Sequence, residues 1–445
     1  MSELVVNVRL WGKPIGALSW DTSRGVAYFE YEPNFVRNPL PVSPIKMPVA
    51  KGVFSFAENR NNCFRGLPGL IADSLPDRFG DQIISEWFQT MGRPLETVTP
   101  LERLCYVGKR SMGALEFEPS LSTLGLDEST EIFVGDLVKL AESVFRDREK
   151  FREKLVQQDK TLYDILRVGT SAGGAKPKAI IAYNESTGEV RSGQVPAPKG
   201  FEYWLLKFDG VSYREHDSIT EIPRGIGNVE YAYYKMALRA GIRMSESRIL
   251  EDSCGCHFMT KRFDRKCDGS KLHMQTLAAL AHLDRDARHS YEDAFAVMRK
   301  LGLDAKADED IFRCMVFNVL AKNNDDHTKN ISFLMDESGI WKLAPAYDLC
   351  YANNPRSRWI NRHQMSVNMK QENVSRDDLK AVAERVGIRK YAGIIDQVEN
   401  AVACWNEIAK DCGVRENHRE EISRELLTSN GIRLFPRIRY VLGND

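Results

Sequence analysis

The spacing of apolar residues changes near residue 265, and this change limits the folds that the chain can adopt. Before it, residues 169–265 carry short alternating or apolar runs that indicate β-strands, as at 178–183 and 203–208, and one amphipathic helix at 229–240. After it the period becomes mostly helical. Helices are expected at residues 272–283, 291–301 and 308–322, and one hairpin at 331–335 and 340–344.

The sequence therefore predicts an α+β fold with two lobes and a cleft between them, a common place for a ligand. The N-terminal lobe is expected to be strand-rich (169–265), and the C-terminal lobe to be all-helical (266–445) apart from that hairpin. Residues 4–31 alternate apolar and polar positions, as antiparallel strands do. Residues 1–120 are expected to form an extra small α/β subdomain, and residues 121–168 a helical connector.

Composition argues against several classes of protein. Lys plus Arg and Asp plus Glu both number 62, so the net charge is zero, which does not favour a strongly basic nucleic-acid-binding protein. The nine cysteines lack the spacing of a zinc site and indicate free thiols in a reducing cytosol. The first residues do not resemble a signal peptide, and no stretch of about 18 apolar residues is present. A cytoplasmic protein without a membrane partner is expected.

Polar residues concentrate at positions 323–330, between an apolar helix and an apolar strand. Asp325 and Asn330 are five positions apart, the separation of the catalytic Asp and the metal-binding Asn in protein kinases. A short irregular loop can direct the Asp at an acceptor hydroxyl and the Asn at a metal ion on the phosphates. Asp348 follows eighteen residues after Asn330 and is placed to supply a second oxygen ligand, of the kind that Mg²⁺ prefers. This pattern predicts magnesium-dependent phosphotransfer.

Phosphotransfer from a nucleotide also needs cations and backbone amides that bind the phosphate oxygens. Lys207 lies in an apolar strand, where a lysine is otherwise poorly placed, and Glu230 at the start of the next helix is the candidate to orient it. Gly173 and Gly174 belong to a segment whose amides can approach phosphate oxygens. This segment is not a Walker A loop, because Ala175 occupies the lysine position and a strand follows where a helix is required.

The segment 259–265 ends the last strand before the helical half. In a two-lobed kinase a segment at this position joins the lobes. Its backbone can hydrogen-bond the edge of adenine, and Phe263 can pack on the ring.

These motifs, in this order, resemble the HipA family of bacterial toxin kinases. The resemblance covers nearly the whole chain and includes N-terminal segments at 66–77 and 107–115. The patterns Asn-x-Asp-x-His-x-Lys-Asn at 323–330 and Arg-Phe-Asp-Arg at 262–265 are highly specific to that family. The resemblance implies a protein-kinase-like fold with an extra N-terminal subdomain. Some members carry Glu where this chain has Lys261, so any contact made by that carboxylate is lost here.

The resemblance also implies roles for individual residues. Asp325 would be the catalytic base, and Asn330 and Asp348 would hold Mg²⁺. Ser171 matches the serine that members of the family autophosphorylate. A phosphate there is expected to eject its loop and silence the kinase, because a dianion is repelled by the phosphates of ATP. The residues expected to bind ATP are Ser171, Gly173, Gly174, Ala175, Lys178, Lys207, Lys261, Arg262, Phe263, His327 and Lys329.

By the same resemblance, the chain is expected to be an ATP-dependent serine/threonine kinase and the toxin of a HipA/HipB-type pair. Its substrate would be a translation-related protein such as an aminoacyl-tRNA synthetase. Its partner would be a small helix-turn-helix antitoxin that binds operator DNA. Two alternatives stay open: a DNA-associated corepressor subunit in which kinase activity is secondary, and a kinase of a small molecule or lipid.

Overall fold

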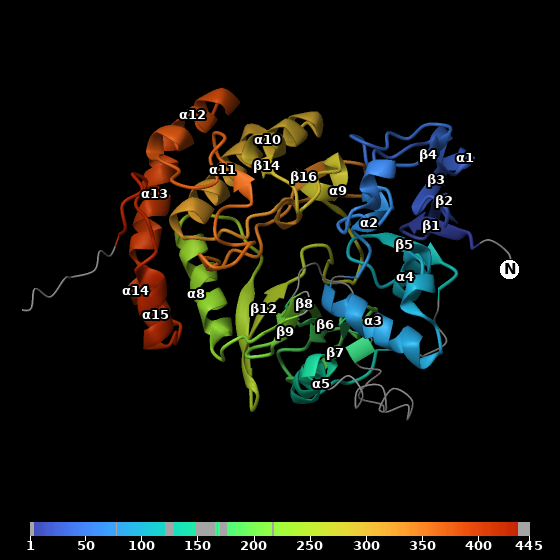
Figure 1. The fold of residues 1–445 in the computed structure, drawn as a ribbon, viewed down its shortest axis with the longest axis horizontal. Coiled ribbons are helices and arrows are strands. Elements are labelled where there is room, and N and C mark those ends of the chain that lie inside the picture. The colour runs from blue at the N-terminus through green and yellow to red at the C-terminus, as the bar shows by residue number, and fades with distance from the viewer. Residues whose placement is uncertain are drawn as a thin grey trace, which may run out of the picture.

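The computed structural model describes residues 4–76, 78–120, 129–146, 165–166, 168–169, 176–215 and 218–434. Three parts surround the middle of the molecule in Figure 1: the N-terminal strands, a second sheet, and the helices of the C-terminal half. Within these ranges, no helix is both long enough and apolar enough to cross a membrane.

The N-terminal domain is built on an antiparallel sheet in the order β4-β3-β2-β1-β5. Strands β1 to β3 lie where the alternation predicted them, because alternate residues such as Val8, Ile15 and Phe29 are buried in one core. The elements are β1 (Val6–Leu10), β2 (Lys13–Asp21), β3 (Val26–Tyr31), α1 (Pro33–Arg37), β4 (Val53–Phe54), η1 (Ala57–Arg60), α2 (Gly69–Ala72), α3 (Arg78–Thr90), η2 (Leu95–Thr97), α4 (Pro100–Val107) and β5 (Leu115–Glu118).

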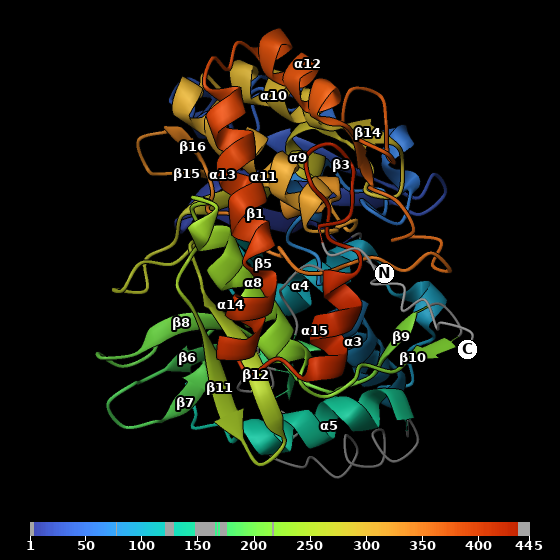
Figure 2. The same ribbon diagram turned by 90° about the vertical axis from the view of Figure 1, so that its left-hand side faces the viewer.

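A second antiparallel sheet has the order β11-β12-β8-β6-β7. Helices α3 and α5 share a buried core with it through Ile83, Leu137 and Trp204, and Figure 2 shows α5 beneath the sheet. Helix α8 packs against β11 and β12. The elements of this part are α5 (Val134–Arg146), β6 (Lys178–Tyr183), β7 (Val190–Ser192), β8 (Glu202–Lys207), β9 (Tyr213–Glu215), β10 (Ser218–Thr220), α8 (Ile226–Arg239), β11 (Ser247–Asp252) and β12 (Gly255–Lys261).

The register of this sheet fixes which side chains face the middle of the molecule. Lys207, at the end of β8, is the cross-strand partner of Lys178 on β6 and of Phe258 on β12. Side chains of directly paired residues point to the same face of a sheet. Lys178 and Lys207 are therefore neighbours on one face.

The C-terminal half is mostly helical, but the prediction of an all-helical lobe is wrong. The expected hairpin is present as β15 and β16, and an unexpected strand, β13, pairs with it. A helix was predicted across 272–283, but its first residues pair with β15, and the helix begins where Thr276 Oγ1 accepts a bond from the backbone nitrogen of Ala279 (3.1 Å). A short parallel pair, β14 and β17, also lies here.

The elements of the C-terminal half are β13 (His273–Thr276), α9 (Leu277–Ala281), β14 (His289–Ser290), α10 (Tyr291–Lys300), α11 (Ala305–Leu320), η3 (Thr328–Asn330), β15 (Ser332–Met335), β16 (Trp341–Leu343), β17 (Met365–Ser366), α12 (Arg376–Val386), α13 (Tyr391–Ala403), α14 (Trp405–Asp411) and α15 (Glu416–Ser423).

A buried ion-pair network just after β12 joins this segment to the N-terminal domain. The carboxylate of Asp264 accepts bonds from Arg262 (Nε, 2.9 Å; Nη2, 2.7 Å), from Arg265 Nη1 (2.8 Å) and from the backbone nitrogen of Gly113 (2.7 Å). Arg265 also donates to the backbone oxygens of Ser111 (2.9 Å) and Gly113 (3.0 Å) in the N-terminal domain. Burial disfavours the charged carboxylate, but the two guanidinium groups hold the pKa of Asp264 well below its usual range.

Replacing Asp264 with Asn would leave two buried guanidinium groups without their carboxylate. We expect the Asp264→Asn variant to be less stable by about 3–5 kcal/mol, measured as a lower unfolding midpoint in urea. Because the folded pKa is lowered, this stabilisation is present above about pH 4 and lost as the pH falls through the folded pKa. The two proteins should therefore converge in acid. Asp268→Asn, an exposed position four residues away, is the control and should keep the parental midpoint.

Candidate active site

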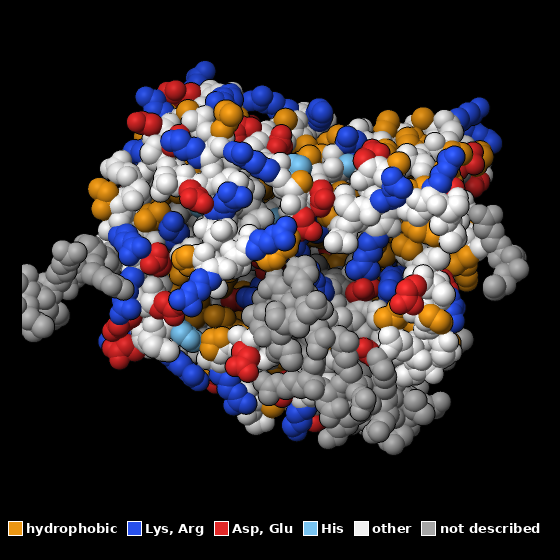
Figure 3. All heavy atoms as spheres, in the orientation of Figure 1, with side chains coloured by type: hydrophobic (Ala, Val, Ile, Leu, Met, Phe, Trp, Pro, Cys, Tyr) orange, Lys and Arg blue, Asp and Glu red, His pale blue; other side chains and the backbone are white. Residues whose placement is uncertain are grey.

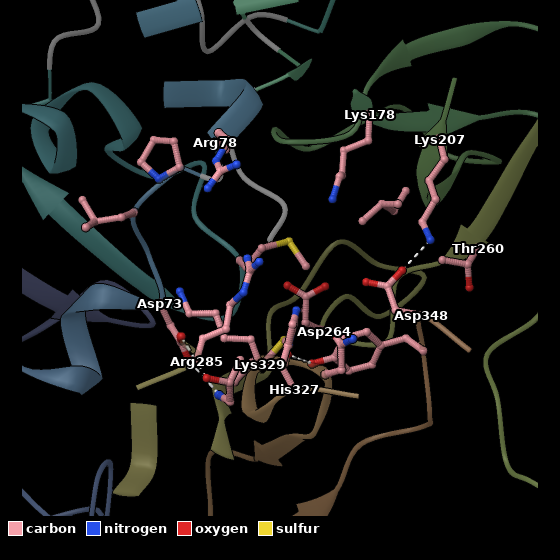
Figure 4. A pocket seen from close by; sticks show the side chains of 18 of the residues that line it. Asp73, Arg78, Lys178, Lys207, Thr260, Asp264, Arg285, His327, Lys329 and Asp348 are labelled. Carbon is pink, nitrogen blue, oxygen red and sulfur yellow. Dashed lines mark hydrogen bonds and ion pairs between the residues drawn. The ribbon is translucent and has the colours of Figure 1, made fainter. Parts of the chain in front are cut away.

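The three parts of the fold line one cleft with a volume of about 580 Å³ (Figure 4). Its walls come from β8 and β12, from the loop between α11 and β15, from the segment after β16, and from α2 and α3 of the N-terminal domain. The residues predicted from the sequence that line it are Lys178, Lys207, Glu230, Lys261, Arg262, Phe263, His327, Lys329, Asn330 and Asp348.

Lys207 is the centre of a charged cluster in this cleft. Its Nζ atom donates to Glu230 Oε2 at 2.7 Å and to Asp348 Oδ1. Lys176 Nζ lies 3.4 Å from Glu230 Oε1, and Lys178 occupies the neighbouring strand. The contact between Lys207 and Asp348 crosses from one lobe to the other and joins residues 141 positions apart. The sequence prediction needed Lys207 to lie close to both Asp325 and Asp348. Lys207 contacts Asp348, and its charge acts on Asp325.

Mutual attraction keeps this cluster ionised although it is partly buried. Burial disfavours the charged form of each group, but the carboxylates of Asp348 and Glu230 raise the pKa of Lys207. Lys207 and Lys178 lower the pKa of Asp348 in the same way, and Lys207 and Lys176 lower the pKa of Glu230. At neutral pH the cluster therefore presents fixed ammonium groups and fixed carboxylates.

The backbone at Asp348 has a left-handed conformation with φ of +53°, which is uncommon for a residue with a side chain. Its carbonyl oxygen accepts a bond from Asn323 Nδ2 at 3.3 Å, and the same amide donates to Asn318 Oδ1 on α11 at 2.9 Å. Strained conformations of this kind persist where surrounding structure fixes them, and they cluster at functional sites. The residue in this conformation is the one whose carboxylate contacts Lys207.

The polar loop 323–330 separates into anchoring and cleft-facing residues. Asp326 is an anchor: it accepts bonds from Tyr291 OH (2.9 Å) and the backbone nitrogen of Gln364 (2.8 Å), and it lies 3.0 Å from His363 Nδ1. Only 1% of its side chain is exposed. The side chain of Asp325 is 48% exposed, so Asp325 is the aspartate of this pair that can meet a substrate.

Asn330 and Asp325 are held in fixed relation. Asn330 Nδ2 donates to the backbone oxygen of Asp325 at 2.8 Å, which leaves the amide oxygen as the end that can meet a cation. Partial shielding of the Asp325 carboxyl from water raises its pKa and the charge of Asp348 adds to this, while Arg285 opposes it. A raised pKa suits a group that has to accept a proton.

The donor set fits a hard divalent cation. Asp348 offers carboxylate oxygens and Asn330 an amide oxygen, the ligand types that Mg²⁺ prefers. Across the described residues, His, Cys, Asp and Glu form no group of three or more that could hold a metal ion. This set suits an ion bound by few protein ligands together with substrate phosphates and water.

His327 is buried beside the proposed catalytic residue. Its Nε2 atom lies 3.8 Å from Asp325 Oδ1. Burial, with the nearby charge of Arg285, lowers the pKa of His327 to about 3, so the ring is neutral at physiological pH.

The segment after β12 only partly matches its predicted role. The ring of Phe263 lies at the cleft with its centroid 5.6 Å from that of Tyr347. The Lys261 side chain pairs with Glu202, and the Arg262 guanidinium is committed to Asp264. Any contact of Lys261 or Arg262 with a nucleotide would therefore come from the backbone. Ser171, Gly173, Gly174 and Ala175 lie outside the described residues.

The cleft lining also includes residues to which the sequence analysis gave no role, and three charged examples are Asp73, Arg78 and Arg285. Asp73 accepts bonds from the backbone nitrogen (2.7 Å) and the hydroxyl (3.0 Å) of Thr276, so it joins the N-terminal domain to the C-terminal half. Asp73 lies in the segment 66–77, which the family resemblance included but to which it assigned no function. A single arginine at a helix start or in a loop carries no motif, so no signal marked the other two.

Family models match most of the chain. The model of the HipA N-terminal domain matches residues 6–118, and the model of the HipA-like C-terminal domain matches residues 170–405, more than half of the chain. The chain belongs to the HipA family. The prediction of this family from the four motifs is confirmed.

The fold agrees with the family. The HipA of a Shewanella oneidensis MR-1 toxin–antitoxin system, solved with HipB and its operator DNA, superposes with a TM-score of 0.63 at 16% identity, covering 94% of both chains. The kinase candidate Y4dM of Sinorhizobium fredii is 23% identical over 239 residues, 49% of this chain. The match spans 55% of that protein, about half its length. A mixed α+β HipA-like kinase fold is thus confirmed.

Because His327 is neutral in the folded protein, the free energy of unfolding should depend on pH. Its folded pKa, about 3, lies below the unfolded value near 6.5, so the unfolded chain takes up a proton first and stability falls as the pH drops below 6.5. Between pH 7 and pH 5, we expect the free energy of unfolding of the His327→Gln variant to fall by about 2 kcal/mol less than that of the parent. Urea unfolding at both pH values measures this difference. Equal losses in the two proteins would contradict the assigned pKa.

Proposed function

We propose that this chain is an ATP-dependent serine/threonine protein kinase. The convergence of Lys207, Glu230, Asp348 and Asn330 in one cleft, with Asp325 in the same loop as Asn330, carries the proposal. Phosphotransfer enzymes need cations for the phosphates, oxygen ligands for a metal and a base for the acceptor hydroxyl. These residues supply all of them from segments far apart in the sequence.

In the proposed reaction, ATP lies between the lobes, with its phosphates held by Lys207 and Lys178 and by amides of the 169–178 segment. Asn330 and Asp348 would hold Mg²⁺, which would neutralise charge on the phosphates. Asp325 accepts the proton of the acceptor hydroxyl. At the same time the hydroxyl oxygen bonds to the γ-phosphorus of ATP, and ADP leaves. Lys207 exchanges its contact with Asp348 for phosphate oxygens.

We further propose that the kinase is the toxin of a HipA/HipB-type pair. The family assignment supports this, as does the fold shared with a HipA solved together with HipB and operator DNA. The partner would be a helix-turn-helix antitoxin, and DNA would be bound mainly through it, because the net charge of this chain is zero. The substrate would be a translation-related protein such as an aminoacyl-tRNA synthetase, with growth arrest as the outcome.

Asp325→Asn tests the catalytic assignment. Loss of the base should reduce transfer of labelled phosphate from ATP to protein by about 10²–10⁴-fold, while the affinity for ATP, measured by calorimetry, stays near the parental value. Glu337→Gln, at an exposed position in the turn between β15 and β16, is the matched control and should keep full activity. Transfer at the parental rate by Asp325→Asn would end the assignment.

The same assay separates the alternatives. With labelled ATP and whole-cell lysate, label in protein bands supports a protein kinase, whereas label in metabolites or lipids supports a kinase of small molecules. A chain that binds operator DNA with an antitoxin but transfers no phosphate would be a corepressor subunit.

Ser171 is proposed as a site of autophosphorylation. Mass spectrometry of the parental protein after expression should detect phosphate on the peptide containing Ser171, and the Asp325→Asn variant should lack it. The neighbouring residue, Thr170, also carries a hydroxyl, so fragment ions have to place the phosphate on Ser171. An unmodified peptide from an active kinase would remove the proposed self-silencing.

A further inference from the structure

Asp209 is a buried aspartate that follows Lys207 and Phe208 at the end of β8 and does not belong to the cleft lining. Figure 3 shows Asp and Glu side chains on the molecular surface, mixed with Lys and Arg, whereas only 3% of Asp209 is exposed. A buried carboxylate is unfavourable unless hydrogen-bond donors surround it. The donors around Asp209 therefore indicate what this residue does.

The carboxylate of Asp209 binds the first turn of α8. Both of its oxygens lie 2.9 Å from the backbone nitrogen of Gly225, and Oδ1 lies 3.3 Å from that of Gly227. Gly225 is the N-cap residue of α8 and has no side chain that could accept such bonds. Asp209 thus supplies, from 16 positions away, the oxygen that a helix usually receives from its N-cap. Its negative charge also suits the positive end of the helix dipole.

The same residue is joined to the sheet. Asp209 Oδ2 lies 3.4 Å from the backbone nitrogen of Cys256 on β12, and the backbone nitrogen of Asp209 donates to His257 Nδ1 at 2.9 Å. Because Nδ1 accepts this bond, the ring proton lies on Nε2, which is 3.0 Å from Asp252 Oδ1 on β11. Asp209 therefore connects the start of α8 to both β11 and β12.

Two glycines allow the helix, the strand and the carboxylate to approach closely. A Cβ atom on Gly227 would lie 1.9 Å from the carbonyl oxygen of Cys256, so only a glycine lets α8 rest on the backbone of β12 at this point. A Cβ atom on Gly255 would lie 2.8 Å from Asp209 Oδ2. Figure 2 shows α8 beside β12. The seat of α8 is thus defined by backbone contacts and one carboxylate.

Helix α8 carries Glu230 near its start, and Glu230 Oε2 lies 2.7 Å from Lys207 Nζ. The end of β8 and the start of α8 are therefore joined twice. One contact is the ion pair between Lys207 and Glu230 in the cleft, and the other is the bond from Gly225 to Asp209 outside the cleft lining. Two attachments limit rotation of the helix, which a single attachment does not. Asp209 thereby restricts movement of Glu230 relative to Lys207.

We propose that Asp209 is a positioning residue for phosphotransfer, which holds α8 so that Glu230 keeps Lys207 directed at the nucleotide phosphates. This inference rests on the proposed kinase function, in which an ion pair between a strand lysine and a helix glutamate has to be in place. Asp209 acts through the helix and touches neither the nucleotide nor the acceptor.

Substitutions at Asp209 test the proposal in the full-length protein. Initial rates of labelled phosphate transfer from ATP to the proteins of a whole-cell lysate are measured at several ATP concentrations, and the rate with Asp325→Asn is subtracted. Asp209→Asn keeps one acceptor oxygen but loses the charge, whereas Asp209→Ala loses every bond of the carboxylate. We expect kcat/KM for ATP to fall about tenfold in Asp209→Asn and further in Asp209→Ala.

The matched control is Ser375→Ala, which removes the side chain that caps α12, a helix outside the cleft lining. Loss of this cap should lower the thermal unfolding midpoint, as loss of a helix cap does, but should leave kcat/KM at the parental value. Thermal unfolding of every variant checks that the fold is retained, and Asp209→Asn decides the question if Asp209→Ala does not fold.

A double-mutant cycle separates positioning from a general loss of stability. If Asp209 acts through Glu230, then Asp209→Asn should lower kcat/KM by less than about twofold in a Glu230→Gln background, whereas independent effects would multiply. Hydrogen exchange followed by mass spectrometry gives a second readout. The amides of residues 225–230 should exchange faster in Asp209→Asn, while those of α12 keep the parental rate.

The outcomes distinguish this inference from the kinase proposal. Parental kcat/KM in both Asp209 variants overturns the inference and leaves the kinase proposal intact. Equal losses from Asp209→Asn in the parental and Glu230→Gln backgrounds also overturn it, because Asp209 would then act independently of Glu230. Absence of phosphotransfer by the parental protein would instead refute the kinase proposal, and the inference with it.

Discussion

The carboxylate of Asp264 is the constraint on which the arrangement of the cleft depends. It is fully buried, and its oxygens accept bonds from Arg262, Arg265 and the backbone of Gly113. A buried charge is tolerated only when its partners surround it, so these segments cannot separate without a large energetic penalty. The segment between the lobes is therefore fixed to the N-terminal domain, and the lobes meet at a set distance.

That distance matters because the charged cluster has members in both lobes. Lys207 and Glu230 come from the strand-rich lobe, and Asp348 comes from the segment after β16. Lys176 and Lys178 add positive charge on the strand side, so the ammonium groups outnumber the carboxylates of Glu230 and Asp348. An anion with several negative oxygens relieves such an imbalance, which is the physical reason that the cluster suits a nucleotide.

The sequence revealed those parts of the site that are marked by residues close together in the chain. A lysine inside an apolar strand and the spacing of Asp325 and Asn330 are visible without a structure, because an unusual residue in a regular element has few explanations. The sequence could not tell why Asp325 is exposed and Asp326 is buried, since that depends on Tyr291 and Gln364, which are distant along the chain. Strand β13 was missed for a similar reason. Its strand character comes from pairing with β15, and the helical period of the following residues masked it.

The N-terminal domain is part of the active site rather than an appended module. Gly113 and Ser111 complete the network around Arg265, Asp73 binds Thr276 at the start of α9, and α3 is packed on the second sheet while its first residue, Arg78, lines the cleft. Without this domain, buried polar groups on the C-terminal part would lose their partners, and each such loss costs about 1–3 kcal/mol. The two family domains are separate in the sequence, but both contribute residues to the same site. The cleft exists only where both are present, because residues of each domain line it.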